Sequence, residues 1–361
     1  MQLSETPAYG PMGSQFFRVD RFARYRAARA NMLAGVSDLV IAEIGDSTTA
    51  GLDALATANT QVPNAPMSQL AGLINGDSSA SIATDDAWCR IRAVGATEPV
   101  ADSRVAQTGG WTKAVGMFNS TAAGTLSFTP RYAADTWDIY YVRNAAGGFT
   151  VNIGGGSTLA TINTSGSAAV IKQTVTGSSG LSPLNIVWTS GTVYIAAVVA
   201  RSSTQKKVIC CNFGCSGVSS SYFLDGVASP WNQQAFLTSF APALVFVNLG
   251  INNWRNSVAL ATYLANMRSI FTYVGVFADM VARVPVFDTG SSGFTSSQQD
   301  YVDGLISLCK ELGVPLINPR KRWGSVAAAD AAGYRSDNVH PAKPGYVDIG
   351  SAYYEGLKHA A

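Results

Sequence analysis

The sequence has few charged residues and no long apolar run. Charged residues make up 13% of the 361 positions, and the formal net charge is +2 at pH 7. The longest basic run, at 320–322, is too short to form the concentrated positive face with which proteins usually bind nucleic acid. No apolar stretch approaches the roughly 20 residues that span a bilayer. We therefore expect neither nucleic acid nor a membrane as a partner.

Cysteine and histidine are also scarce. Five cysteines, an odd and sparse set, argue against a disulfide scaffold. Three of them fall in the run CCNFGC at 210–215, where a zinc site would need further ligands nearby. The two histidines, His340 and His359, stand far from that run. We interpret the run as small buried thiols and expect no metal site there.

The N-terminal segment 1–17 lacks periodicity and is expected to be a tail or an extended arm. It has no basic start followed by an apolar block, so no secretory signal is visible. Cytoplasm, virion and a processed secreted form all remain open as locations.

Strand-like and helix-like segments alternate at both ends of the chain, whose 47% hydrophobic content suits sizeable cores. Helices are expected over 18–35, 64–75, 257–274, 296–313 and 342–359, and buried strands over 37–47, 207–214, 242–250, 282–290 and 314–319. Ser296 or Ser297 is expected to cap the fourth of these helices. This alternation predicts an α/β fold with a doubly wound parallel sheet flanked by helices.

The segment from about 110 to 206 has a different texture. Few charges occur there, and seven short strand-like runs are separated by Gly, Ser and Asn clusters, with no helical periodicity. Such a pattern favours an all-β sandwich or jelly roll. We expect an arm and helix start at 1–29, an α/β domain at 30–85 and 207–361, and a β insertion at 86–206.

The tripeptide Gly-Asp-Ser occurs twice, ending at Ser47 and at Ser78. Ser47 directly follows a buried strand, and ligands of open α/β sheets bind at the carboxyl ends of the strands. Ser78 follows a helix in a polar segment typical of a helix stop and turn. Ser47 is therefore the candidate nucleophile.

A serine nucleophile needs a base, and the base needs a group that orients it. His359 stands at the C-terminal end, where chains usually fray. His340 lies in a polar loop with Asp337 three residues before it, a spacing that lets the carboxylate reach the same ring. A cap or loop-holding role is the alternative for this histidine, but no other residue offers a base.

Charge that develops on a carbonyl oxygen requires preorganised donors. The backbone N–H of Ser47, the backbone N–H of Gly217 and the side-chain amide of Asn252 all follow predicted strands. Taken singly, Gly217 and Asn252 could equally be ordinary turn residues.

Together these residues resemble the GDSL/SGNH hydrolase superfamily. The blocks that carry the resemblance are Gly45-Asp46-Ser47-Thr48-Thr49-Ala50-Gly51, Gly217, Gly250-Ile251-Asn252-Asn253 and Asp337-Asn338-Val339-His340-Pro341. The resemblance implies an SGNH, flavodoxin-like three-layer fold. It also implies Ser47 as nucleophile, His340 as base and Asp337 as orienting group. Ser47, Gly217 and Asn252 would form the oxyanion hole.

The chain departs from the family pattern in two respects. Asn253 replaces the acidic residue that usually follows the asparagine of the third block, which puts the local hydrogen bonding in question. The separation between Ser47 and Gly217 is far longer than the family core needs. In this layout the chain is similar to bacterial and phage-borne SGNH carbohydrate esterases that carry an inserted sandwich domain.

These features predict a serine esterase that needs no cofactor and acts on acyl esters, with O-acetyl groups of a polysaccharide or glycoconjugate favoured. Aromatic residues of the β-rich segment could stack on sugar rings or fill its core: Trp111, Tyr132, Trp137, Tyr140, Tyr141, Trp188 and Tyr194. The alternatives are a short-chain esterase or thioesterase acting on small esters, and a non-catalytic glycan-binding adhesin. The sequence does not indicate an oligomeric state.

Overall fold

The computed structural model describes residues 14–15, 19–53, 61–76, 84–89, 102–114, 117–143, 146–225, 232–290 and 298–360. Its parallel strands lie in the order β17 (Leu316–Ile317), β16 (Asp279–Arg283), β15 (Leu244–Asn248), β2 (Leu39–Gly45), β14 (Val208–Gly214) and β3 (Thr84–Cys89). At one edge, β1 (Ser14–Gln15) pairs antiparallel with β17. The N-terminal segment, expected as a tail or arm, thus contributes an edge strand.

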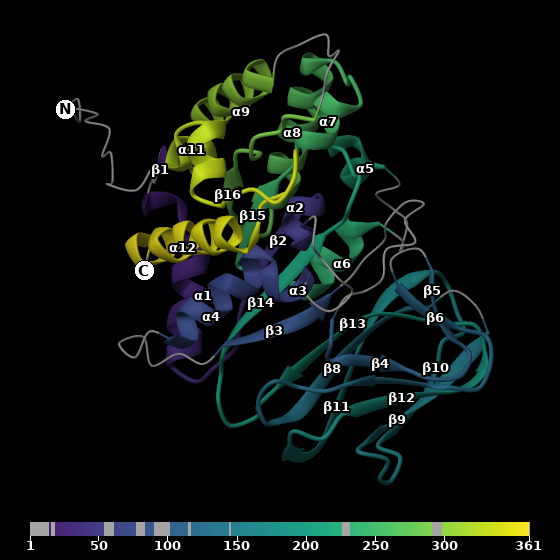
Figure 1. The fold of residues 1–361 in the computed structure, drawn as a ribbon. Coiled ribbons are helices and arrows are strands. Elements are labelled where there is room, and N and C mark those ends of the chain that lie inside the picture. The colour runs from purple at the N-terminus through teal and green to yellow at the C-terminus, as the bar shows by residue number, and fades with distance from the viewer. Residues whose placement is uncertain are drawn as a thin grey trace.

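Helices flank this sheet, as the alternation of elements predicted (Figure 1). The long helices are α1 (Ala23–Leu33), α4 (Pro66–Gly76), α8 (Leu260–Gly275), α9 (Gln298–Leu312) and α12 (Lys343–Ala360). The shorter helices are η1 (Val19–Arg21), α2 (Ser47–Ala50), α3 (Gln61–Asn64), α5 (Ser220–Leu224), α6 (Gln233–Phe240), α7 (Ile251–Arg255), α10 (Pro319–Trp323) and α11 (Val326–Ala331). Ser296 and Ser297, expected to cap α9, lie outside the described residues.

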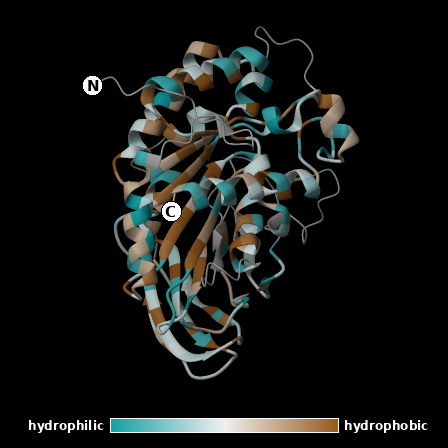
Figure 2. Ribbon diagram, turned by 90° about the vertical axis from the view of Figure 1, so that its left-hand side faces the viewer, coloured by the Kyte–Doolittle hydropathy of each residue, from teal (hydrophilic) through white to brown (hydrophobic). Residues whose placement is uncertain are grey.

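The parallel strands are buried on both faces, which is why their sequences are almost continuously apolar. In β15 every residue is buried, and in β2 all but Val40 are. Figure 2 shows hydrophobic residues concentrated along the strands that the helices cover. A strand was expected to run over 282–290, but β16 ends at Arg283. Pro285, which has no N–H to donate to a neighbouring strand, stands just beyond its end.

The described residues 102–201 contain no helix and form what we call the β-rich region, at the lower right of Figure 1. Its strands are β4 (Val105–Gln107), β5 (Trp111–Ala114), β6 (Met117–Ser120), β7 (Thr125–Phe128), β8 (Ala134–Arg143), β9 (Gly147–Ile153), β10 (Ala160–Asn163), β11 (Ala169–Gly180), β12 (Leu184–Gly191) and β13 (Val193–Arg201). One antiparallel sheet has the order β10-β9-β12-β7-β4. The remaining strands extend the parallel sheet, because β13 pairs antiparallel with β3.

Strand β8 is shared between two hydrophobic cores. Trp137, Ile139 and Tyr141 belong to the core of the β-rich region, which includes residues of both its sheets. The intervening Tyr140 and Val142 belong to the core of the α/β region. Tyr140 stacks on Phe240 of α6 with ring centroids 3.9 Å apart. Alternate side chains of one strand thus bind the two regions to each other. Strand β3 crosses the predicted domain boundary between residues 85 and 86. The division of the chain into domains stays a prediction.

Candidate active site

Ser47 is the first residue of α2 and lies immediately beyond the carboxyl end of β2. Asp46 caps this short helix, since its Oδ1 accepts hydrogen bonds from the Thr48 N–H at 2.9 Å and the Thr48 hydroxyl at 2.9 Å. Gly51 ends the helix in a left-handed conformation, with φ 82°. These local hydrogen bonds turn the chain sharply and place Ser47 at the strand end, where the sequence predicted it. Ser78 lies outside the described residues.

Helix α2 packs directly on the backbone of two strand ends. A Cβ atom at Gly45 would stand 2.1 Å from Thr49 Oγ1, and one at Gly214 would stand 2.2 Å from the Ala50 nitrogen. No side chain other than hydrogen fits at either position. Gly45 belongs to the first motif block, whereas Gly214 lies outside every block, at the corresponding register of the neighbouring strand β14.

The structure brings Ser47, His340 and Asp337 together. The Ser47 Oγ lies 3.0 Å from His340 Nε2, and His340 Nδ1 lies 2.8 Å from Asp337 Oδ2. Both distances are within hydrogen-bond range. Ser47 is buried, with 6% of its surface exposed, whereas the side chains of His340 and Asp337 are partly exposed. Ser47 is thus the most enclosed of the three residues.

The loop that carries His340 is held by its own backbone. Asp337 Oδ1 accepts hydrogen bonds from the Val339 and His340 N–H groups at 2.6 Å each. The His340 carbonyl accepts a bond from the Ser336 N–H at 3.0 Å. Burial alone would raise the pKa of Asp337, but the hydrogen bonds from the His340 ring and from the two N–H groups outweigh it and lower that pKa. The carboxylate is thus favoured beside the ring.

Gly217 and Asn252 lie on neighbouring segments beyond β14 and β15. Gly217 is exposed and has φ +76°, and a Cβ there would meet nothing within 4 Å. Asn252, in α7, donates a hydrogen bond from Nδ2 to the Val218 carbonyl at 2.9 Å. This bond uses one of its two amide hydrogens and fixes the amide beside the residue that follows Gly217. The oxyanion-hole role of Ser47, Gly217 and Asn252 stays a prediction.

Asn253 forms hydrogen bonds with Ser220. Its Oδ1 accepts from the Ser220 N–H at 3.0 Å, and its Nδ2 donates to the Ser220 Oγ at 2.9 Å. Asn253 is completely buried. The amide therefore ties α7 to the start of α5, and the departure from the family's acidic residue leaves this local hydrogen bonding satisfied.

Sequence reasoning missed a group of buried polar residues beneath α2. Glu43 of β2, Arg283 of β16 and Asn248 of β15 are each 0% exposed. Burial raises the pKa of Glu43 and of Asp46, against the opposing effect of the Arg283 charge on both. A signal for two of them was present, because Glu43 and Arg283 each interrupt an apolar strand sequence with a charge.

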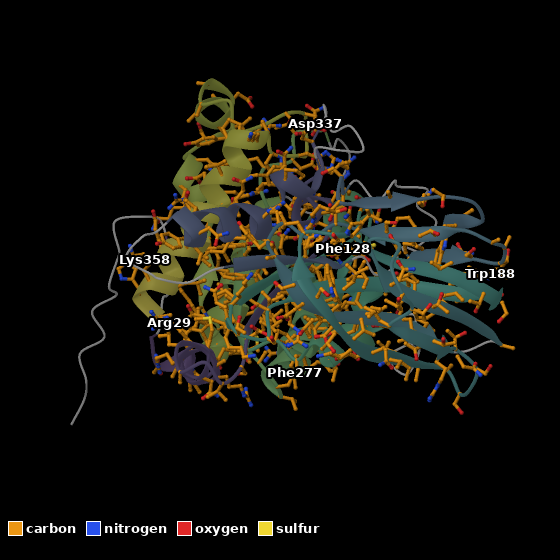
Figure 3. The ribbon with its side chains drawn as sticks, turned by 90° about the horizontal axis from the view of Figure 1, so that it is seen from below. Arg29, Phe128, Trp188, Phe277, Asp337 and Lys358 are labelled. Atoms are coloured by element: carbon orange, nitrogen blue, oxygen red, sulfur yellow. The ribbon has the colours of Figure 1, made fainter. Side chains whose placement is uncertain are left out.

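Most of the aromatic residues of the β-rich region fill cores. Trp111, Trp137, Tyr140 and Tyr141 are buried, Trp188 and Tyr194 are partly buried, and Tyr132 is 38% exposed. Tyr132 lies under the Lys207 ammonium group, 5.2 Å from the ring centroid, and accepts a hydrogen bond from Asn75 at 2.7 Å. Figure 3 places Trp188 at the far end of the β-rich region, well away from Asp337. Core packing thus accounts for the four buried rings.

The described residues hold no group of three or more His, Cys, Asp or Glu side chains arranged to bind a metal ion. Cys210, Cys211 and Cys215 are buried, in agreement with their interpretation as buried thiols. Within the described ranges, no helix is both long and apolar enough to cross a bilayer.

Comparison with known proteins agrees with the fold and the motifs. Residues 182–347 match the model of the GDSL-like lipase/acylhydrolase family. The match includes Gly217, Asn252, Asp337 and His340 and leaves out the Ser47 block. No curated protein sequence matches the chain.

Among solved structures, a peptidoglycan O-acetylesterase is 13% identical and superposes with a TM-score of 0.68 over 95% of this chain and 97% of its own. A family two carbohydrate esterase from Clostridium thermocellum is 11% identical, with a TM-score of 0.34 over 71% of this chain and 98% of its own. The acetylxylan esterase Axe2 from Geobacillus stearothermophilus is 18% identical, with a TM-score of 0.33 over 42% of this chain and 73% of its own. Residues 182–347 thus match the GDSL-like lipase/acylhydrolase family, and the chain as a whole shares its fold with the solved peptidoglycan O-acetylesterase.

Proposed function

We propose that this protein is an SGNH esterase that removes acetyl groups from the hydroxyls of a polysaccharide or glycoconjugate, with Ser47 as nucleophile, His340 as base and Asp337 as orienting group. The proposal is carried by one observation, the unbroken chain of contacts from the Ser47 hydroxyl through both ring nitrogens of His340 to the Asp337 carboxylate. Support for the substrate class comes from the solved peptidoglycan O-acetylesterase, which resembles the chain over almost its whole length.

In the proposed reaction the Ser47 oxygen attacks the ester carbonyl carbon while His340 Nε2 accepts the hydroxyl proton. The Asp337 carboxylate stabilises the imidazolium ion that forms. The carbonyl oxygen, now negative, is stabilised by the N–H groups of Ser47 and Gly217 and the amide of Asn252. The bond between the carbonyl carbon and the sugar oxygen then breaks, and His340 gives its proton to that oxygen, which leaves as a hydroxyl. Water repeats the sequence on the acetyl-enzyme and releases acetate.

The nucleophile is tested by hydrolysis of 4-nitrophenyl acetate. Wild-type enzyme should turn the ester over, and Ser47→Ala should lose activity by at least about a thousandfold, because the acyl-enzyme can no longer form. Ser127→Ala, which removes a hydroxyl bonded to Asn185 in the β-rich region, is the matched control and should keep full activity. Undiminished turnover by Ser47→Ala would overturn the proposed mechanism.

The substrate class is tested by release of acetate from acetylated xylan, O-acetylated peptidoglycan and acetylated capsular glycans. We expect release from at least one polymer, lost in Ser47→Ala. An enzyme that hydrolyses 4-nitrophenyl esters of several chain lengths but releases acetate from none of these polymers is instead a general short-chain esterase. In that case the β-rich region, which we propose to be an insertion in the hydrolase domain, shapes the pocket rather than recognising a glycan.

A further inference from the structure

A fully buried ion pair lies beneath the helix that carries Ser47. The Arg283 guanidinium donates hydrogen bonds to Glu43 Oε1 from Nη2 at 2.9 Å and from Nε at 3.2 Å, and both side chains are 0% exposed. The two residues come from β2 and β16, which are separated in the sheet by β15. Replacing such a pair by apolar residues is often neutral or stabilising, so stability alone is a weak reason for its presence.

The ion pair is connected to the Ser47 helix through one hydroxyl. Thr49 Oγ1 donates to Glu43 Oε1 at 3.1 Å, and it accepts hydrogen bonds from Arg283 Nη2 at 3.2 Å and Asn248 Nδ2 at 3.0 Å. These three bonds use the single donor and both acceptor sites of a hydroxyl. Thr49 is itself 0% exposed and stands two residues after Ser47 in α2. Residues from three strands therefore converge on the turn that presents the nucleophile.

The same network reaches the helix that follows the base. Tyr353 of α12 donates a hydrogen bond to Glu43 Oε1 at 2.7 Å, and its ring stacks on Phe246 at a centroid distance of 3.9 Å. Tyr346, two turns earlier in α12, donates to the carbonyl of Leu52, just after the Ser47 helix. Helix α12 therefore contacts the chain on both sides of Ser47. It also adjoins the base, because it starts at Lys343, three residues after His340.

We propose that Glu43 and Arg283 are positioning residues that act through Thr49 to hold the Ser47 hydroxyl at its distance from His340. The inference rests on the proposed role of Ser47 and extends it. A four-residue helix is too short to be stable on its own, because so few residues cannot repay the cost of nucleation. Its geometry must come from the contacts beneath it, and small displacements of reacting groups cost rate steeply.

The deciding experiment compares Thr49→Val with Thr49→Ser. Valine keeps the shape of the side chain and removes all three hydrogen bonds, whereas serine keeps the hydroxyl. We expect kcat on 4-nitrophenyl acetate to fall about tenfold in Thr49→Val with KM changed less than about twofold, since a misplaced nucleophile slows the chemical step. Thr49→Ser should restore kcat to within about twofold of wild type.

Thr164→Val is the matched control, because Thr164 is also 0% exposed but belongs to the β-rich region, where its hydroxyl faces the Thr192 carbonyl at 3.5 Å. It should lower the thermal midpoint without changing kcat. The inference is overturned if Thr49→Val behaves in the same way, with a lower midpoint and an unchanged kcat. It is overturned equally if Thr49→Ser is as slow as Thr49→Val.

Glu43→Gln tests the charged pair itself. Glutamine keeps an oxygen that can accept from Arg283 and Tyr353 but removes the charge, so we expect a folded enzyme with kcat lowered about tenfold and little change in KM. Unchanged kcat in folded Glu43→Gln would remove Glu43 from the proposal. Ser47→Ala separates failure of the proposed function from failure of the positioning role. If it remains active, the proposed function fails; if it is inactive while Thr49→Val and Glu43→Gln are both fully active, only the positioning role fails.

Discussion

The two hydrophobic cores of this protein differ in what is buried within them. The α/β core surrounds a charged and amide-rich group, in which Glu43, Asp46, Asn248 and Arg283 are all 0% exposed. The core of the β-rich region is made of aliphatic and aromatic side chains. Its buried carboxylates, Asp102 and Asp138, pair with arginines that retain some solvent contact.

The two regions therefore differ in the free-energy cost of the charged groups that they bury. A buried charge costs several kcal/mol unless it is paired and hydrogen-bonded, and an apolar core carries no such cost. The β-rich region has the composition expected of a scaffold. The α/β region buries Glu43, Asn248 and Arg283 beneath the Ser47 turn, whose geometry we propose that they hold. We therefore expect substitutions in the core of the β-rich region to lower stability, and substitutions in the polar group beneath the Ser47 turn to lower turnover.

The largest effect is expected from Trp137→Ala in the β-rich core. Trp137 is 0% exposed, and its removal should lower the free energy of unfolding by about 3–5 kcal/mol through lost burial and the cavity left behind. Turnover of 4-nitrophenyl acetate per folded molecule should stay unchanged. Urea denaturation and steady-state kinetics measure the two quantities. A folded variant with strongly reduced kcat would show that packing of the β-rich region shapes the active site, and the contrast between the cores would fail.

Asn252→Ala should have the opposite pattern. If its amide binds the oxyanion as proposed, kcat should fall about 100–1000-fold, or about 3–4 kcal/mol of transition-state stabilisation. The unfolding midpoint should change little, because Asn252 is only partly buried. Asn185→Ala in the β-rich region, where the amide donates to Asn152 at 3.0 Å, serves as the matched control. A raised KM with unchanged kcat would instead assign Asn252 to substrate binding.

Asn253 allows a smaller and purely structural test inside the α/β core. Asn253→Ala leaves the buried N–H and hydroxyl of Ser220 without their amide partner and should cost about 1–3 kcal/mol of unfolding free energy. Asn253→Asp supplies the family's usual residue, whose carboxylate can accept from both Ser220 groups, so it should be more stable than the alanine variant. Thermal denaturation compares the three proteins. Equal stability of the alanine and aspartate variants would mean that these two bonds contribute nothing.

The sequence pattern was sufficient to predict the contacts of residues that stand at a strand end or close to their partner in the chain. Ser47 follows an apolar strand, and Asp337 lies three residues before His340, so strand ends and local spacing predicted a contact that spans 293 positions. The alternation of elements also predicted the parallel sheet and its flanking helices. The buried aromatic residues of the β-rich region fitted the core-packing alternative, since large rings usually fill a sandwich.

Strand order was what the pattern could not supply. Glu43 and Arg283 are 240 positions apart and meet only because β15 separates β2 from β16 by a single strand. Periodicity identifies strands but does not order them, so a pair across a third strand is invisible until the sheet is assembled. Strand β3 was not predicted from the sequence, for a related reason. Its sequence, TDDAWC, lacks strand alternation, and its place is fixed by pairing with β14 and β13.

The smallest expected effect concerns the pH dependence of the unfolding free energy, to which buried carboxyl groups of the two regions contribute with opposite sign. Burial alone would raise the pKa of Asp102, but hydrogen bonds and charge from Arg104 outweigh it and lower that pKa. A carboxylate with a lowered pKa stabilises the fold above its unfolded value of about 3.9, and this contribution is lost as the pH falls through the folded value. The difference in unfolding free energy between wild type and Asp102→Asn should therefore shrink as the pH falls from about 6 to about 3. Glu43 and Asp46, whose pKa values are raised by burial, contribute in the opposite direction, since their share of the stability is present at low pH and lost as the pH rises. Urea titrations at several pH values measure the difference, and a gap that stays constant with pH would mean that Asp102 titrates alike in the folded and unfolded states.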